Sequence, residues 1–180
     1  MNTHLHKGFT LIETLVAISI LVLSVTGAFA AAQKGLSSAT YSKNQIIAFY
    51  LADEGIEMIR NLRDQNALNG LNDSSNWLTG IAQNGGDQCY FNKKCMVDAV
   101  NKILKQCTSG FSNSDCDVLQ QDPVNGFYGY TSGWTDTNFT REVGITSISP
   151  NEISVLVHVT WKQGTITRQF DVRENMLNWQ

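Results

Sequence analysis

The sequence predicts an α+β fold, in which one long N-terminal helix precedes a C-terminal antiparallel β-meander. Two patterns carry this prediction. The first is a stretch without proline from residue 9 to about Arg63, whose second half is amphipathic. The second is a strictly alternating apolar segment near the C-terminus, flanked by turn residues. Because a sheet with one apolar face needs a cover, we expect the amphipathic part of the helix to pack on it.

The first part of the predicted helix is apolar on all sides. Between residues 9 and 32 the only charged side chain is that of Glu13. A helix of this length measures about 36 Å, enough to cross the roughly 30 Å hydrocarbon core of a bilayer. The preceding residues carry Lys7 and no acidic group, so the positive-inside rule keeps them cytoplasmic and places the rest of the chain outside. This predicts a single-pass protein of the cytoplasmic membrane, in contact with its lipid.

A secretory signal peptide is the alternative interpretation of this segment. Such peptides have an apolar region of about 7–15 residues followed by a small-residue cleavage site. The alanine-rich residues 28–32 resemble such a site, but the apolar run is longer than a signal peptide needs. The length therefore favours an anchor that is retained.

The second half of the helix, residues 33–65, is amphipathic. Asp53, Glu54 and Glu57, supported by Arg60, predict a solvated face. The segment 66–75 is rich in Asn, Gly and Ser, which predicts the end of the helix. The apolar stripe predicted to face a core consists of Phe49, Ala52, Ile56 and Ile59, with Leu62 close to it.

Residues 66–180 are expected to form a globular α+β head. Met96–Cys107 is compatible with a short helix, and residues 126–134 predict a loop with a short strand. Turn residues at 149–151 and 162–164 separate three predicted strands. These strands cover residues 139–148, 152–161 and 165–173, and the middle one directs Ile153, Val155, Val157, Val159 and Trp161 to one side.

Four cysteines lie close together in the head, and their spacing does not fit the C-x2–4-C pairs of zinc sites. Because the head is expected outside the cytoplasm, two disulfides are favoured over a metal. Four cysteines allow three pairings, and we prefer the nearest-neighbour one. The residues are Cys89, Cys95, Cys107 and Cys116.

No pattern in the chain indicates an enzyme or a cofactor. The sequence lacks the G-x-S-x-G, H-E-x-x-H and phosphate-loop motifs. His158 is interpreted as a structural or surface residue of a strand. Asp122 and Asp136 lack the spacing of an EF-hand, so a calcium site is disfavoured.

Two groups of residues in the head raise the question of a ligand. The net charge is −3, so a few lysines predict solvated side chains rather than a nucleic-acid site. The aromatic residues predict core or loop packing rather than an adhesive patch. The lysines are Lys93, Lys94, Lys102 and Lys105, and the aromatic residues are Phe127, Tyr128, Tyr130 and Trp134.

The stretch KGFTLIETLVAISIL, residues 7–21, resembles the N-terminus of type IV pilins and pseudopilins. The resemblance implies a pilin-like fold and a prepilin peptidase that cuts between Gly8 and Phe9 and N-methylates Phe9. It also implies that Glu13 attracts the terminal amine of a neighbouring subunit, and that subunits pack through their N-terminal helices. The alternative for Glu13 is a side chain that extends to the cytoplasmic interface.

The resemblance divides the chain into four parts. They are a leader peptide of residues 1–8, a transmembrane and filament-core helix of residues 9–32, its amphipathic continuation to residue 65, and the head of residues 66–180. The stretch IETLVAISIL and the closing Leu177–Trp179 resemble the minor pilins, including the type IV pilus modification group and its counterpart minor pseudopilins of type II secretion. Major pilins often carry a proline in the apolar helix, so its absence here favours a minor subunit.

This resemblance implies a structural subunit that is incorporated into a cell-surface type IV pilus, or that initiates or modifies it. The alternatives are a minor pseudopilin of type II secretion and an adhesive or DNA-uptake pilin. A hydrolase anchored by its signal segment is a third, which the missing catalytic motifs oppose. The kind of filament, the subunit's place in it and any ligand of the head stay open at this point.

Overall fold

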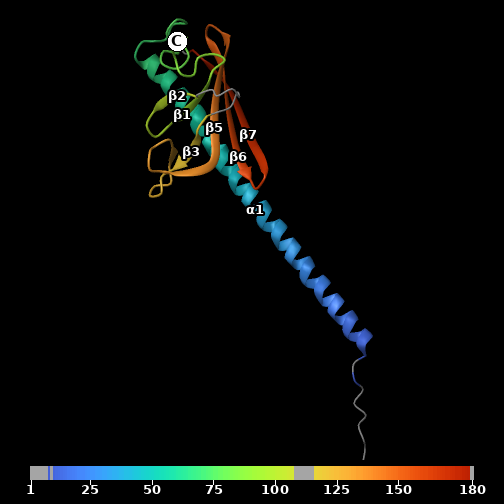
Figure 1. Cartoon of the computed structure of the whole chain (residues 1–180). Coiled ribbons are helices and arrows are strands. Elements are labelled where there is room, and N and C mark those ends of the chain that lie inside the picture. Colours follow the sequence, from blue (N-terminus) through green and yellow to red (C-terminus); the bar gives the residue numbers. More distant parts are fainter. Residues whose placement is uncertain (1–7, 9, 108–115, 179–180) are drawn as a thin grey trace, which may run out of the picture. The chain divides into compact units, whose positions relative to one another are not determined.

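The computed structural model describes residues 8, 10–107 and 116–178 of the chain. Its first element is the helix α1, Leu11–Leu68 (Figure 1). The chain divides into two units, residues 1–43 and 44–180, and α1 contributes to both. The predicted long helix is therefore confirmed, and it extends a few residues into the Asn-rich segment that was expected to end it.

In the first unit, α1 is a helix whose apolar side chains are exposed. Among the described residues, α1 is the helix that is long and apolar enough to cross a membrane, and none of its most apolar window is buried in the protein. Its hydroxyl side chains donate hydrogen bonds to helix carbonyls three or four residues earlier, which reduces the cost of placing them in lipid. These are Thr14, Ser19, Ser24 and Thr26.

The second unit contains a sheet of seven strands in the described residues. The strands are β1 Lys94–Asp98, β2 Ile103–Gln106, β3 Val118–Gln121, β4 Tyr128–Gly129, β5 Thr135–Ser149, β6 Glu152–Gln163 and β7 Ile166–Leu177. All pairs are antiparallel. β5, β6 and β7 form the predicted meander, and β1 and β3 pair with different parts of β5 on the edge opposite to β6.

The predicted alternation of β6 is confirmed. Ile153, Val155, Val157, Val159 and Trp161 are all buried, with at most 2% of their surface exposed. Residues 44–68 of α1 run along this part of the sheet (Figure 1). The helix buries small and apolar residues in turn, namely Ala48, Leu51, Ala52, Gly55, Ile56, Met58 and Ile59. The head is thus a helix packed on one face of an antiparallel sheet.

Gly55 permits the closest approach between helix and sheet. A Cβ at this position would lie 3.3 Å from a methyl carbon of Val157 and 3.4 Å from Arg141 Cδ. This contact explains a glycine in the interior of a helix, where it costs about 1 kcal/mol relative to alanine. The prediction for Phe49 is wrong, because its ring is 48% exposed and contacts Phe170 at the edge of the interface. Small Ala48 takes the buried position.

The short helix expected in Met96–Cys107 is wrong as well. The segment forms most of a hairpin of β1 and β2, with Asp98 paired to Ile103. The Asp98 carboxylate accepts a hydrogen bond from the Asn101 backbone at 3.0 Å, and Lys102 has a left-handed φ of 56°. Asx-type bonding of this kind competes with a helix and favours a turn.

Candidate functional site

The N-terminal candidate site lies at the first turn of α1. Thr10 precedes the helix, and its Oγ1 accepts a hydrogen bond from the Glu13 backbone at 3.3 Å. Thr10 is therefore an N-cap, and the sequence Thr-x-x-Glu is that of a capping box. Sequence reasoning missed this role, although the spacing was a sufficient signal. Glu13 also places a negative charge at the positive end of the helix dipole.

Two of the predicted processing residues precede this turn. Gly8 is exposed, and no described atom lies within 4 Å of where a Cβ would be. Nothing in the described fold therefore requires glycine at this position. Phe9, the residue predicted to be N-methylated, and residues 1–7 lie outside the described residues. The same holds for Trp179 in the C-terminal resemblance.

The strongest polar centre of the head is the fully buried side chain of Arg141 on β5. Its guanidinium donates to the Leu51 carbonyl of α1 at 2.9 Å, to the Glu54 carboxylate, and to the Val97 carbonyl of β1. One side chain thus joins the helix, the central strand and the hairpin. Both terminal nitrogens of Arg141 are thus paired, whereas its buried Nε has no hydrogen-bond partner among the described residues. Breaking the pairs of a buried charge is costly.

Arg141 was not singled out in the sequence, although a signal was present. It occupies the inward register of β5, between buried Phe139 and Val143, where apolar residues are expected. The interpretation of Glu54 as a purely solvated residue is therefore corrected. Glu54 lies at the rim of the helix–sheet interface, where it offsets the Arg141 charge.

Two further arginines connect α1 to β7. Arg60 bonds both carboxylate oxygens of Glu174 at 2.6 Å and also pairs with Glu57, as the sequence suggested. These carboxylates raise the pKa of Arg60, since their hydrogen bonds favour its charged form. Arg63 is buried and donates to the Leu177 carbonyl at 3.1 Å. The helix is thus fixed to the last strand at two successive turns.

Tyr130 lies next to the Arg141 centre. Burial raises the pKa of its phenol to about 12, the neighbouring charges of Asp117 and Asp98 act in the same direction, and that of Arg141 opposes them. Its backbone donates to the Asp98 carboxylate at 3.3 Å, so the residue is anchored to the turn after β1. Tyr130 also packs against the cluster of Met96, Cys107 and Cys116.

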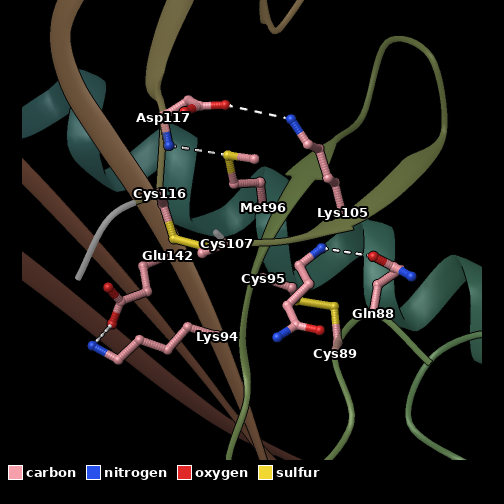
Figure 2. The surroundings of a disulfide bond; sticks show 11 residues. Gln88, Cys89, Lys94, Cys95, Met96, Lys105, Cys107, Cys116, Asp117 and Glu142 are labelled. Carbon is pink, nitrogen blue, oxygen red and sulfur yellow. Dashed lines mark hydrogen bonds and ion pairs between the residues drawn. A yellow bond between two sulfur atoms is a disulfide. The ribbon is translucent and has the colours of Figure 1, made fainter. Parts of the chain in front are cut away.

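Two disulfides fix the β1–β2 hairpin at its open end. Cys89 is bonded to Cys95 at the start of β1, and Cys107, directly after β2, is bonded to Cys116. The nearest-neighbour pairing is therefore the one in the structure. Figure 2 shows the surroundings of the second bond, where the Asp117 backbone donates to the Met96 sulfur and Lys105 pairs with Asp117 at 3.6 Å. The hairpin is held to the sheet by covalent bonds as well as by packing.

Three of the four lysines bond partners within the head. Lys94 forms an ion pair with Glu142 (Figure 2), Lys105 pairs with Asp117, and Lys93 donates to the Gly85 carbonyl at 2.8 Å. Two of the four lysines, Lys94 and Lys105, thus have an acidic partner within the head. This favours the interpretation as solvated surface groups over a nucleic-acid site, which needs uncompensated positive charge.

The remaining candidates have structural roles in the described residues. Asp122 accepts bonds from Val124 and Asn125, which lower the pKa of its carboxyl. Asp136 accepts from Gln120, and His158 pairs with Asp171 on the neighbouring strand. Within residues 8, 10–107 and 116–178, no group of three or more His, Cys, Asp or Glu is placed to hold a metal.

Of the four aromatic residues, only Phe127 is exposed, at 57%. Tyr128 packs edge-on against Phe139, and Trp134 lies close to Gly129. Tyr130 belongs to the disulfide cluster already described. The packing interpretation therefore fits these residues better than a continuous adhesive patch.

One segment of the chain matches the model of a known protein family. Residues 4–29 match the family model described as the prokaryotic N-terminal methylation motif. No curated protein and no solved structure matches the chain. The matched segment contains Gly8, Phe9 and Glu13.

The motif and the fold together define the class. The chain resembles type IV pilins and pseudopilins in its prepilin N-terminal motif and in its pilin-like α+β architecture. Pilin-family proteins are structural and non-enzymatic, and the motif implies processing by a prepilin peptidase followed by assembly with other pilins. The apolar helix next to the motif suggests a membrane anchor before assembly.

Replacement of Arg141 tests the polar centre of the head. We expect Arg141→Ala to lower the free energy of unfolding by about 3 kcal/mol or more, because the buried carbonyls of Leu51 and Val97 lose their donor. Arg60→Ala removes a more exposed helix–sheet pair and should cost about 1 kcal/mol or less. Urea unfolding of the detergent-solubilised chain measures both, and equal losses would contradict the central role of Arg141.

The raised pKa of Tyr130 predicts a loss of stability at alkaline pH. Between pH 10 and about 12 the unfolded tyrosine is ionised while the folded one keeps its proton, so unfolding becomes more favourable as pH rises. The contribution is complete below pH 10 and amounts to about 2–3 kcal/mol by the linkage relation. Alkaline titration at 295 nm together with urea unfolding should show this step, and Tyr130→Phe should remove it. An unchanged alkaline slope in Tyr130→Phe would refute the assignment.

Proposed function

We propose that this protein is the membrane-anchored precursor of a minor pilin, which is incorporated into a type IV pilus or initiates or modifies it. Residues 1–8 are its leader, residues 9–32 its anchor and later its part of the filament core, and residues 33–65 the continuation of the helix. The head begins near residue 66. The observation that carries the proposal is the prepilin motif at the start of an apolar helix with one internal carboxylate.

The position of Glu13 supports a role in assembly. Cleavage after Gly8 would give Phe9 a free cationic amine, four residues before the Glu13 carboxylate. Two opposite charges attract strongly in an apolar setting, and each is costly there when left alone. The amine of an incoming subunit therefore finds its partner in Glu13 of a subunit already in place. Apolar packing along the helix then holds the two together.

The surroundings of Gly8 support a role in processing. Since a Cβ at this position would meet no described atom, the described fold gives no constraint that selects glycine. A peptidase that binds the chain in an extended form beside its catalytic groups is such a constraint, because glycine allows the closest backbone approach.

The finer choice of a pilus over a secretion filament depends on weaker features. The helix α1 has no proline and runs unbroken from Leu11 to Leu68, which resembles minor subunits. The acidic net charge, together with the pairing of Lys94 and Lys105 to carboxylates, favours a structural subunit over a DNA-uptake pilin. A minor pseudopilin of type II secretion is the alternative, and it shares the processing and assembly chemistry proposed here.

Substitution of Gly8 tests the processing step. With Gly8→Val we expect the uncleaved precursor to accumulate in membranes of cells that express a prepilin peptidase, because the branched side chain blocks the approach of the enzyme. Gly35→Val, at an exposed helix glycine with no neighbour within 4 Å, is the matched control and should be cleaved normally. Electrophoretic mobility and N-terminal sequencing measure cleavage. Normal maturation of Gly8→Val would contradict the proposal.

Substitutions of Glu13 and Thr10 distinguish a role of Glu13 in assembly from its role in the helix cap. Glu13→Gln keeps a side chain suited to a capping box but removes the charge. We expect it to be cleaved normally, yet to enter filaments at least about tenfold less than wild type, equivalent to roughly 1.4 kcal/mol. Thr10→Val removes the N-cap and keeps the charge, so it should assemble better than Glu13→Gln. If Glu13→Gln enters filaments as well as wild type does, the charge of Glu13 has no role in assembly and only its capping role remains. This result would contradict the proposal.

A further inference from the structure

The head has a cavity of about 210 Å³ between α1 and β4. Its walls are the side chains of Ile47, Tyr50, Leu51 and Tyr128, and its single charged lining residue is Glu54. Tyr50 is 65% exposed at its margin. The cavity therefore offers apolar and aromatic walls around one carboxylate, a combination that suits the long apolar stem and cationic head of a lysine side chain.

Glu54 retains capacity for a second partner. Arg141 donates to its Oε2, and among the described residues no donor bonds its Oε1. The side chain is also 36% exposed, so an external cation can reach it. Arg141 in turn fixes the carboxylate in position, which reduces the entropy lost when a second cation binds.

The charges of α1 are separated along its length. Between residues 14 and 52 the only charged side chains are Lys34 and Lys43, and the acidic residues begin at Asp53. Lys43 lies eleven residues before Glu54, which is about 16 Å in a helix and close to three full turns. The two side chains thus share one face of the helix, yet they are too far apart to pair within one chain.

The same face continues the apolar lining of the cavity at helical spacing. It consists of Leu36, Thr40, Lys43, Ile47, Tyr50 and Glu54, which alternate at intervals of four and three residues. Leu36 is 72% exposed and Lys43 is exposed. Intervals of four and three are those by which two parallel helices pack along a seam. A parallel helix of the same sequence, displaced by about three turns, places Lys43 of one copy opposite Glu54 of the other.

We propose that the cavity is a second assembly site, and that its occupant is Lys43 of a second copy of this chain. The Lys43 stem lies between Tyr50 and Tyr128, and its ammonium meets Glu54 Oε1. Copies anchored in one membrane are parallel, as this contact requires. The inference rests on the proposed function. Phe9 and Glu13 pair at an offset of about one helical turn, whereas Lys43 and Glu54 require about three turns, so the second contact joins a different pair of subunits.

Cysteine crosslinking between two separately tagged full-length chains tests this contact. One chain carries Asn44→Cys and the other Asp53→Cys, which flank the proposed contact and leave Lys43, Tyr50, Glu54 and Arg141 in place. Both are expressed with the prepilin peptidase and assembly proteins, and a short bismaleimide is added to intact cells. A product with both tags can arise only between copies. We expect the mixed product to exceed the matched control by at least tenfold.

The matched control replaces Asn44→Cys by Gly35→Cys, which is nine residues earlier and on the opposite side of the helix. Equal crosslinking of the two pairs, or no mixed product in cells that form filaments, overturns the Lys43 contact while the proposed function stands. If the wild-type chain is neither processed nor found in filaments, the proposed function itself is contradicted. In a second assay, Lys43→Glu should reduce assembly severalfold and Lys43→Arg should retain it. Equal assembly of these two variants also contradicts the inference.

Discussion

The structure depends on one constraint: a single helix has to be stable in two different environments. In residues 11–43 its apolar side chains are exposed on every side, whereas in residues 44–68 it buries one stripe against a sheet. No proline interrupts the transition. The first environment requires lipid or other helices, since exposed leucines and isoleucines in this number are unfavourable in water. The second requires a partner fold, which the antiparallel meander supplies.

Arg141 connects this helix to the rest of the head. Apolar packing alone allows a helix to slide on a sheet, but a guanidinium that bonds a helix carbonyl, a helix carboxylate and a hairpin carbonyl permits one register. The two disulfides then secure the hairpin that provides the third of these partners. These contacts oppose rotation of the helix relative to the sheet.

The sequence predicted correctly those elements whose periodic pattern extends over many residues. It did not predict the features that depend on single polar side chains. The alternation in β6 and the apolar run of α1 each extend over many residues, so they predicted the meander and the long helix correctly. Met96–Cys107 was misassigned because one carboxylate, that of Asp98, was enough to turn a helix-like pattern into a hairpin. The bonding role of Arg141 could not be predicted, because the carbonyls that it bonds, those of Leu51 and Val97, are far away in the sequence. The capping role of Thr10 was visible in the residues themselves.

The central claim is that the chain is matured as a prepilin, and the intact mass of the mature protein tests it most directly. The full chain would be expressed with a prepilin peptidase, purified from membranes and measured by mass spectrometry with N-terminal sequencing. The account predicts a chain that lacks residues 1–8 and begins at Phe9 with one added methyl group. A chain that begins at Met1, or one cut near Gln33, would contradict it.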